Sequence, residues 1–221
     1  MSETPILAFD MKRFLSTGLF VVATLLAFRL FPADANMDES LQAGVLGIVF
    51  LLCLPILYVI FVEKEPLSSI GFQGSVKKYG FLTAVVAVIP FLVVWYSVIA
   101  IGGTDVTYSL PNFIQDSFLY FVLYEVVLVG IVSVLFEVFF RGLIMLSWLS
   151  KTGILAVFLQ GGIFVAFLAA FGGIGWNSTP MILAAFASGF VAHRTRSIYY
   201  SWFSGWLTLF LADVAFLVFG R

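Results

Sequence analysis

The segment SVLFEVFFRGLIML, residues 133–146, is the stretch from which the fold can be inferred. It is apolar apart from Ser133 and two residues of opposite charge, Glu137 and Arg141. An unpaired charge in the hydrocarbon of a bilayer is costly, so such residues are expected to face other helices. Because the acid precedes the base by four residues, the two side chains lie on one helix face and can form an ion pair. This spacing fits either a brace between helices or part of a functional site.

The composition of the whole chain indicates a membrane protein. Of its 221 residues, 62% are hydrophobic and only 10% are charged, whereas about a quarter of a typical soluble domain is charged. The length allows one integral membrane domain and leaves little room for a soluble one. The formal net charge of −1 gives no reason to expect nucleic-acid binding. The single cysteine, Cys53, is expected to be a buried packing residue.

Apolar segments of about the length that a transmembrane helix needs, roughly 20 residues, recur along the chain. We predict seven of them: residues 12–31, 41–62, 79–101, 113–148, 153–173, 179–193 and 197–219. The fourth is too long for one perpendicular crossing, so it should tilt, project from the membrane or break near Gly130. The sixth is short enough to be a partial span. The predicted fold is an all-α, polytopic membrane helical bundle, with two N-terminal helices in residues 1–62 and the core in residues 63–221 of a single domain.

The segments between the predicted helices differ in charge on the two sides of the membrane. With seven crossings, one side carries basic residues: Lys12, Arg13, Lys64, Lys77, Lys78, Lys151, Arg194 and Arg196. The opposite side carries no Lys or Arg between helices, and its charged residues are Asp34, Asp38, Glu39 and Asp105. The positive-inside rule therefore predicts a cytoplasmic N-terminus and a C-terminus outside. We expect the membrane to be a prokaryotic plasma membrane.

Three segments carry a resemblance to a known family. FEVFFRG, residues 136–142, resembles the first motif of the CPBP (Abi) family of CAAX-type and bacteriocin-processing intramembrane proteases, whose pattern is Glu-Glu-x3-Arg, usually followed by Gly. PLSSIGF, residues 66–72, resembles the Leu-Gly-Phe segment of that family. ASGFVAHRTRSI, residues 187–198, resembles its short glycine-containing helix, basic turn and final helix. The resemblance covers residues 63–219 and implies a CAAX-protease-like core.

The family's catalytic residues are largely replaced in this chain. The first Glu of the motif, regarded in the family as the base that activates water, corresponds to Phe136. The second motif, Phe-x3-His, would place its histidine at Leu168 or at Phe171. The third, His-x3-Asn/Asp, matches Leu209 and Asp213, so the acid is retained and the histidine is not. The resemblance therefore implies a pseudoenzyme, in which Glu137 and Arg141 form a structural ion pair.

The residues themselves support no familiar hydrolytic site. The only histidine, His193, falls at a predicted helix end, and no His or Cys cluster offers metal ligands, so neither a metal nor a cofactor is expected. The obvious polar side chains within predicted spans are Glu125, Glu137, Gln160 and Asp213. Two close carboxyl groups can share a proton and activate water, so a Glu137–Asp213 pair remains an alternative, although Arg141 competes for Glu137.

Aromatic stripes suggest helix packing or a binding pocket. Trp202 and Trp206 share a helix face with Leu209 and Asp213, and a second stripe consists of Gln160, Phe164, Phe167 and Phe171. A pocket between them would suit a lipid, a prenyl-like chain, a pigment or a helix of a partner. Three hypotheses follow: a noncatalytic accessory or assembly subunit of another integral membrane protein, a divergent CPBP endopeptidase, and a lipid or small-molecule carrier. In each, the bilayer is a partner of the chain.

Overall fold

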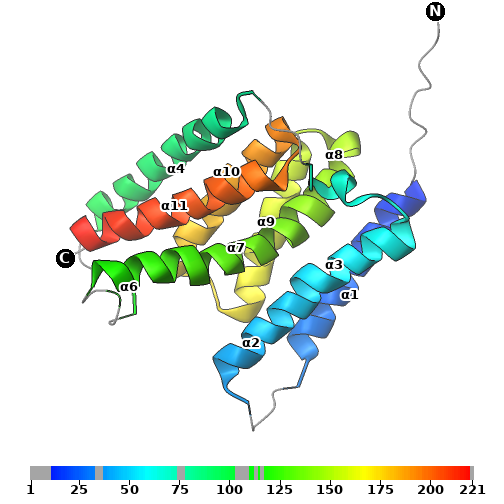
Figure 1. Ribbon diagram of the computed structural model, residues 1–221, viewed down its shortest axis with the longest axis horizontal. Helices are drawn as coiled ribbons and strands as arrows, with labels where there is room; N and C mark the ends of the chain where they lie inside the picture. The colour runs from blue at the N-terminus through cyan, green and yellow to red at the C-terminus, as the bar shows by residue number, and fades with distance from the viewer. Residues whose placement is uncertain are drawn as a thin grey trace, which may run out of the picture.

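The computed structural model describes residues 11–32, 37–73, 78–102, 110–111, 114 and 117–219. Across these residues the secondary structure is helical, without a strand, which confirms the predicted all-α bundle (Figure 1). Lys77, Asp34 and Asp105, which contributed to the charge argument, lie outside the described residues.

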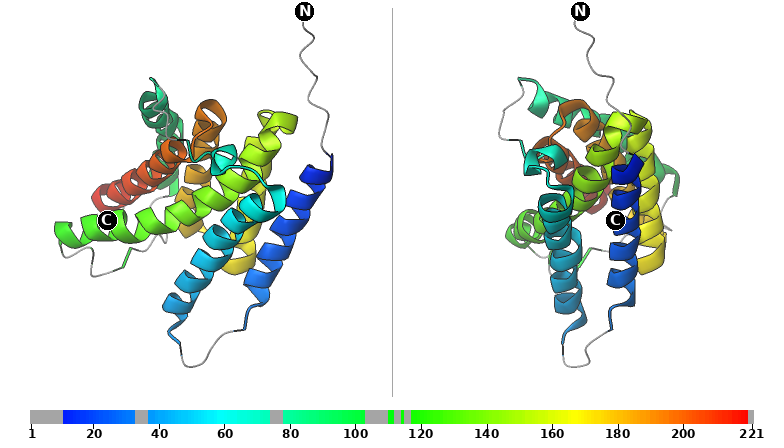
Figure 2. Two further views of the ribbon diagram at one scale, coloured as in Figure 1. Left: turned by 45° about the vertical axis from the view of Figure 1, so that its right-hand side comes forward. Right: turned by 90° about the vertical axis from the view of Figure 1, so that its right-hand side faces the viewer.

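Two antiparallel N-terminal helices lie side by side (Figures 1 and 2). The first is α1, Met11–Leu30. The second is continuous over Ser40–Glu63 and consists of α2 (Glu39–Gly47), π-helical Ile48–Cys53, α3 (Leu54–Leu57) and π-helical Tyr58–Glu63. Arg13 on α1 joins the two helices, because its guanidinium lies 2.8 Å from Glu63 and 3.1 Å from Glu65.

The remaining helices form the larger part of the bundle. A 3-10 turn, Leu67–Ile70, precedes α4, Gly80–Gly102. A single rod then runs over Phe118–Thr152, 35 residues; we call it the long helix. Its parts are α6 (Phe118–Leu123), π-helical Tyr124–Val129, α7 (Gly130–Phe136), π-helical Glu137–Leu146 and α8 (Ser147–Thr152). The chain ends with α9 (Leu155–Phe171), a 3-10 turn (Trp176–Ser178), α10 (Thr179–Thr195) and α11 (Ile198–Phe219).

The long helix does not break at Gly130. This glycine has ordinary right-handed helical dihedrals, and its carbonyl accepts a hydrogen bond of 3.0 Å from the indole of Trp202 on α11. A side chain at position 130 would come within 4.0 Å of the same indole. A Cβ would be in ordinary van der Waals contact there, so the helix is continuous through Gly130 and the alternative of a break is wrong.

Among the described residues, five helices are long and apolar enough to cross a membrane: α1, the helix over Ser40–Glu63, α4, the long helix and α11. Every one of the seven predicted segments is helical, but α9 and α10 have only 17 residues each. Length and hydropathy therefore support five spans rather than seven. The shortness of the sixth predicted segment is confirmed, and α9 is shorter than its predicted range of 153–173.

The segment SVLFEVFFRGLIML, residues 133–146, forms the centre of the core. All ten residues of Glu137–Leu146 are buried. Phe139, Phe140, Leu143 and Ile144 belong to one cluster that also receives side chains from α1, α9 and the helix over Ser40–Glu63. The two charges are therefore surrounded by protein, as the cost of exposing them to hydrocarbon requires. Cys53, in contrast, is exposed, so its predicted burial is wrong.

Two glycines bring the turn at residues 67–70 against this centre. A side chain at Gly142 would lie 3.0 Å from the backbone oxygen of Ile70. Gly71 has a φ of +92°, and its carbonyl accepts a hydrogen bond of 3.1 Å from the amide of Ile198 at the start of α11. The three segments that carry the family resemblance thus meet around Gly142.

Candidate functional site

The ion pair predicted from the spacing of its residues is formed. Nε of Arg141 lies 3.3 Å from Oε1 of Glu137, and each residue is 3% exposed. Nε of Arg141 also donates a hydrogen bond of 2.8 Å to Oγ of Ser188 on α10. The hydroxyl of Ser201 on α11 donates a bond of 2.6 Å to Oε2 of Glu137. The pair therefore connects the long helix to α10 and α11.

Small residues make room for the carboxylate between these helices. Gly205 on α11 lies one turn beyond Ser201, and a side chain there would be 3.3 Å from Oε1 of Glu137 and 3.3 Å from Cβ of Ser188. Buried ion pairs stabilise a fold only when further hydrogen bonds satisfy both charges. The two serines supply such bonds, so the local sequence of α10 and α11 is matched to the pair.

An aromatic cluster surrounds Phe136, the residue that the sequence resemblance aligns with the catalytic base of the CPBP family. Its ring packs edge-on against Phe164, with centroids 5.4 Å apart, and against Phe167 at 5.9 Å. Phe164 also lies under the Arg141 guanidinium, whose central carbon is 5.6 Å from the ring centroid. No group at position 136 can accept a proton, and its neighbours on α9 are hydrocarbon.

The other positions of the degenerate motifs are spread over the bundle. Leu209 and Asp213 line a cavity next to Phe136, whereas Leu168 lines a separate hollow near Gly172. His193 lies in the last turn of α10 and lines neither the cavity nor that hollow. Across the described part of the chain, no group of three or more His, Cys, Asp or Glu residues is placed to hold a metal ion.

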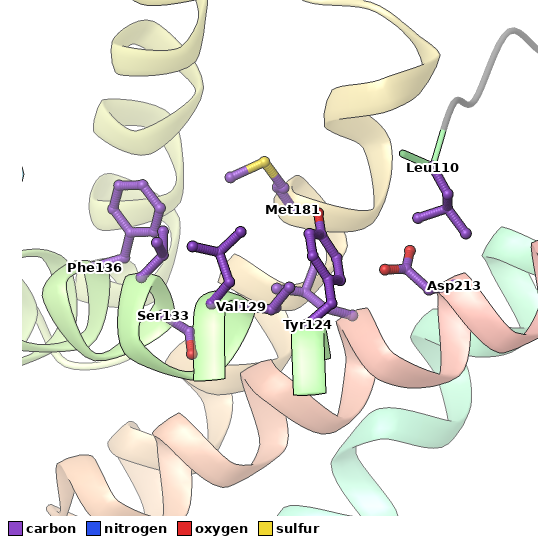
Figure 3. A pocket seen from close by; sticks show the side chains of 10 residues that line it. Leu110, Tyr124, Val129, Ser133, Phe136, Met181 and Asp213 are labelled. Carbon is purple, nitrogen blue, oxygen red and sulfur yellow. The ribbon is translucent and has the colours of Figure 1, made fainter. Parts of the chain in front are cut away.

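A cavity of about 300 Å³ lies between the long helix, α10 and α11 (Figure 3). Its lining comprises Leu110, Tyr124, Leu128, Val129, Val132, Ser133, Phe136, Met181, Leu209 and Asp213. Phe136 and Asp213 lie at opposite ends, and the Asp213 carboxyl points toward Tyr124 (Figure 3). A chamber of about 20 Å³ beside the ion pair shares Ser133, Phe136, Met181 and Leu209 with it. That volume suffices for about one water molecule.

The carboxyl group next to Asp213 belongs to Glu125 and not to Glu137. Glu125 and Asp213 interact directly through their side chains, whereas Glu137 is held by Arg141 and Ser201. The pairing follows from the packing of the long helix against α11, which runs in the opposite direction (Figure 1). Glu125 lies near the start of one helix and Asp213 near the end of the other. In an antiparallel helix pair these two positions lie side by side, and this is the signal in the sequence that could have identified the pair.

Most residues of the predicted pocket serve in packing. Gln160 donates a hydrogen bond of 3.0 Å to the carbonyl of Ala185. Trp206 donates one of 2.9 Å to the carbonyl of Glu125, and the ring of Phe167 packs at a tilt against that of Phe171, with centroids 4.5 Å apart. Trp202 bonds Gly130, as described above. Of the seven predicted residues, only Asp213 lines the larger cavity, and only Phe164 lines the smaller chamber.

The stripe that lines the larger cavity along the long helix was not among the residues predicted from the sequence. Tyr124, Leu128, Val132 and Phe136 follow one another at intervals of four residues and therefore share a helix face. Because three of the four are apolar, hydropathy does not distinguish this face from one that contacts lipid.

Comparison of the chain with protein-family models, with curated proteins and with solved structures gave no match. The site is interpreted from its own geometry.

Proposed function

We propose that this chain is a noncatalytic membrane protein with a CPBP-like core, acting as an accessory or assembly subunit of another integral membrane protein. The observation that carries the proposal is the packing of Phe136 against Phe164 and Phe167. Hydrolysis of a peptide bond requires an activated water and stabilisation of the oxyanion. The position of the base is occupied by a benzyl group, and both oxygens of the neighbouring Glu137 are engaged by Arg141 and Ser201.

The meeting of three separate segments supports the CPBP-like core. Residues 66–72, 136–142 and 187–198 carry the sequence resemblance. The close approach of Ile70 to Gly142 and the hydrogen bond between Ile198 and Gly71 bring parts of all three together. An ancestral active site of this kind would need that arrangement to hold its residues, and a binding protein that descends from it would keep the frame.

The proposed orientation has the N-terminus in the cytoplasm of a prokaryotic cell and the C-terminus outside. It does not depend on whether α9 and α10 cross the membrane. If both cross, there are seven spans, and if both fold back as a re-entrant pair, there are five; Lys151 and Arg194 remain on the cytoplasmic side in either case. Four parts of the chain lie toward one end of the bundle (Figure 2): the start of α1, the start of α4, the whole of α8 and the end of α10. Their common position supports this arrangement.

The test is purification of the tagged full chain from its native membrane in a mild detergent, with mass spectrometry of the co-purifying proteins. An unrelated polytopic protein with the same tag and expression level is the control. We expect a membrane protein in near-stoichiometric amount that the control does not recover. A chain that elutes alone, after cross-linking in the membrane as well, would contradict the accessory role.

The same preparation distinguishes the divergent endopeptidase. Glu137→Gln and Asp213→Asn change a carboxyl group into an isosteric amide, and an enzyme that uses these residues would lose cleavage of its membrane substrates in both variants. We expect the membrane peptides of cells expressing either variant to match those of the wild type. An accumulating uncleaved substrate in both variants would establish the endopeptidase instead.

A further inference from the structure

The observation that leads beyond the proposed function is the environment of Glu125. Its side chain is 0% exposed, and among the described residues no amide, hydroxyl or cationic group donates a hydrogen bond to either carboxyl oxygen; its neighbour is the carboxyl group of Asp213. The residue's backbone oxygen, in contrast, accepts the bond from Trp206. An ionised carboxyl group without a partner in a nonpolar environment is strongly unfavourable. Ionisable residues inside membrane helices are rare for this reason, and they commonly mark the place where a ligand or ion binds.

A second acid adds to the negative charge at this point. The carboxyl group of Asp213, 4% exposed, interacts directly with that of Glu125. The phenol of Tyr124 lies within electrostatic range of both acids and adds a hydrogen-bonding group to the same end of the cavity. The described ion pairs of Arg13 and Arg141 involve Glu63, Glu65 and Glu137, and none involves Glu125.

Of the two acids only Asp213 lines the cavity, which continues from that residue as an apolar channel. The stripe of Tyr124, Leu128, Val132 and Phe136 lines it, and the 12 residue steps from Tyr124 to Phe136 correspond to roughly 18 Å of helix. One leaflet contributes about half of a hydrocarbon core of roughly 30 Å, so the channel is about as long as one leaflet is deep. Leu128 is 55% exposed and Val132 38% exposed, which leaves the channel open at its side, where lipid would lie around a spanning helix.

We propose that this cavity binds a single-chain amphiphile with a protonated amine, the amine lying against Asp213, whose carboxyl group interacts with that of Glu125, and the hydrocarbon chain extending toward Phe136. Charge complementarity selects the head group: an amine gains two acidic neighbours, a neutral alcohol gains only hydrogen bonds, and a fatty acid would add a third negative charge. The cavity volume of about 300 Å³ is at the lower end of the range for ligand pockets, which favours one chain over two. This proposal does not depend on the accessory role.

The test uses the full chain in a nonionic detergent and dodecylamine as the probe. The alkyl amine of this probe, like the side-chain amine of lysine, is protonated at pH 7. Binding is followed by native mass spectrometry and by isothermal titration, with 1-dodecanol and dodecanoic acid as probes of equal chain length. We expect saturable binding of one dodecylamine, and affinity weaker by about tenfold or more for Glu125→Gln and for Asp213→Asn, since each loses a buried charge pair. Glu65→Gln, which changes an acid near Arg13, should bind as the wild type does.

Two results would overturn the proposal. One is equal affinity of the wild type for dodecylamine and dodecanol, or no saturable binding of the amine. Either outcome would mean that Glu125 and Asp213 share a proton with each other and do not bind an amine. The other is unchanged amine binding by Glu125→Gln and Asp213→Asn. If neither variant folds, Val132→Trp at the open side of the channel decides, because it fills the chain-binding part without altering a charge. Loss of amine binding in that variant supports the proposal, and retention overturns it.

Discussion

The hydroxyl of Ser201 donates a 2.6 Å hydrogen bond to the carboxylate of Glu137, 64 residues earlier in the chain. With Arg141 on the other oxygen, the acid is held from its own helix and from α11. A carboxylate fixed on both oxygens is a poor proton acceptor and a good structural connection. This relationship distinguishes the ion pair from the Glu125–Asp213 pair, in which the oxygens of Glu125 have no such bonds.

Removing the acid of the ion pair should destabilise the protein strongly. Glu137→Ala leaves the Arg141 guanidinium buried without its counter-charge, and breaking a buried pair from one side costs about 3–5 kcal/mol. The double variant Glu137→Ala/Arg141→Met should recover part of this loss, because no uncompensated charge remains. Thermal unfolding in detergent, followed by circular dichroism, measures both effects.

The control for this experiment is Glu65→Ala. Glu65 also pairs with an arginine, but its side chain is 38% exposed, and exposed pairs contribute about 0–1 kcal/mol. Equal midpoints for Glu137→Ala and Glu65→Ala would show that the buried pair is not a brace.

Two adjacent glycines on α9 should respond differently to substitution. A Cβ at Gly161 would lie 2.5 Å from the ring of Phe186 on α10, whereas a Cβ at Gly162 meets nothing within 4 Å. Gly161→Ala should therefore destabilise the α9–α10 contact by about 1–3 kcal/mol. Gly162→Ala should be neutral or stabilise the helix by up to about 1 kcal/mol. The midpoints of thermal unfolding of the two variants provide the comparison, and a loss of stability in Gly162→Ala equal to that in Gly161→Ala would contradict this packing.

The indole of Trp202 should contribute more than its volume. It donates 3.0 Å hydrogen bonds to the carbonyl of Gly130 and to the hydroxyl of Ser133. Trp148 is buried too, but its indole nitrogen has no hydrogen-bond partner among the described residues. Trp202→Phe should therefore cost about 0.5–1.5 kcal/mol more than Trp148→Phe, the net contribution of a hydrogen bond. Denaturation of the two variants in the same detergent tests this, and a larger loss for Trp148→Phe would refute it.

Phe136→Glu would introduce the acid of the family that the sequence resembles, and it should not create an enzyme. Phe136→Glu places a carboxyl group against Phe164 and Phe167, where it has no designed partner, so we expect a loss of stability of about 1–3 kcal/mol. The histidine positions remain leucines at 168 and 209, so no peptide hydrolysis is expected in a membrane-peptide assay. Phe136→Leu controls for the loss of the ring. Hydrolysis by Phe136→Glu alone would mean that a base at position 136 is all the site lacks.

The sequence was sufficient for some features because their signals are local. Each predicted apolar segment is a helix, since runs of such residues are long and interrupted by polar turns. The Glu137–Arg141 pair follows from a four-residue spacing within one helix, and the structure confirms it. The neighbour of Asp213 could not be obtained in this way, because it depends on how far two helices are shifted along each other.

Burial could not be predicted from hydropathy, for a physical reason. Leu128 is 55% exposed and Phe139 is 0% exposed, yet both are apolar residues of the same helix. In a membrane, the lipid-facing surface is as apolar as the core, so a scale that separates hydrocarbon from water does not separate core from surface. The error at Cys53 and the missed cavity stripe both have this origin.

The unequal lengths of neighbouring helices have a consequence for the surrounding lipid. The long helix measures roughly 52 Å for its 35 residues, whereas α9, with 17, measures roughly 26 Å. A hydrocarbon core of about 30 Å cannot match both, so the long helix must incline or project, and the bilayer must thin beside α9 if that helix crosses it. Such hydrophobic mismatch makes the slope of the cavity-bearing helix sensitive to acyl-chain length. The protein should therefore be enriched in membrane regions whose thickness suits its inclination.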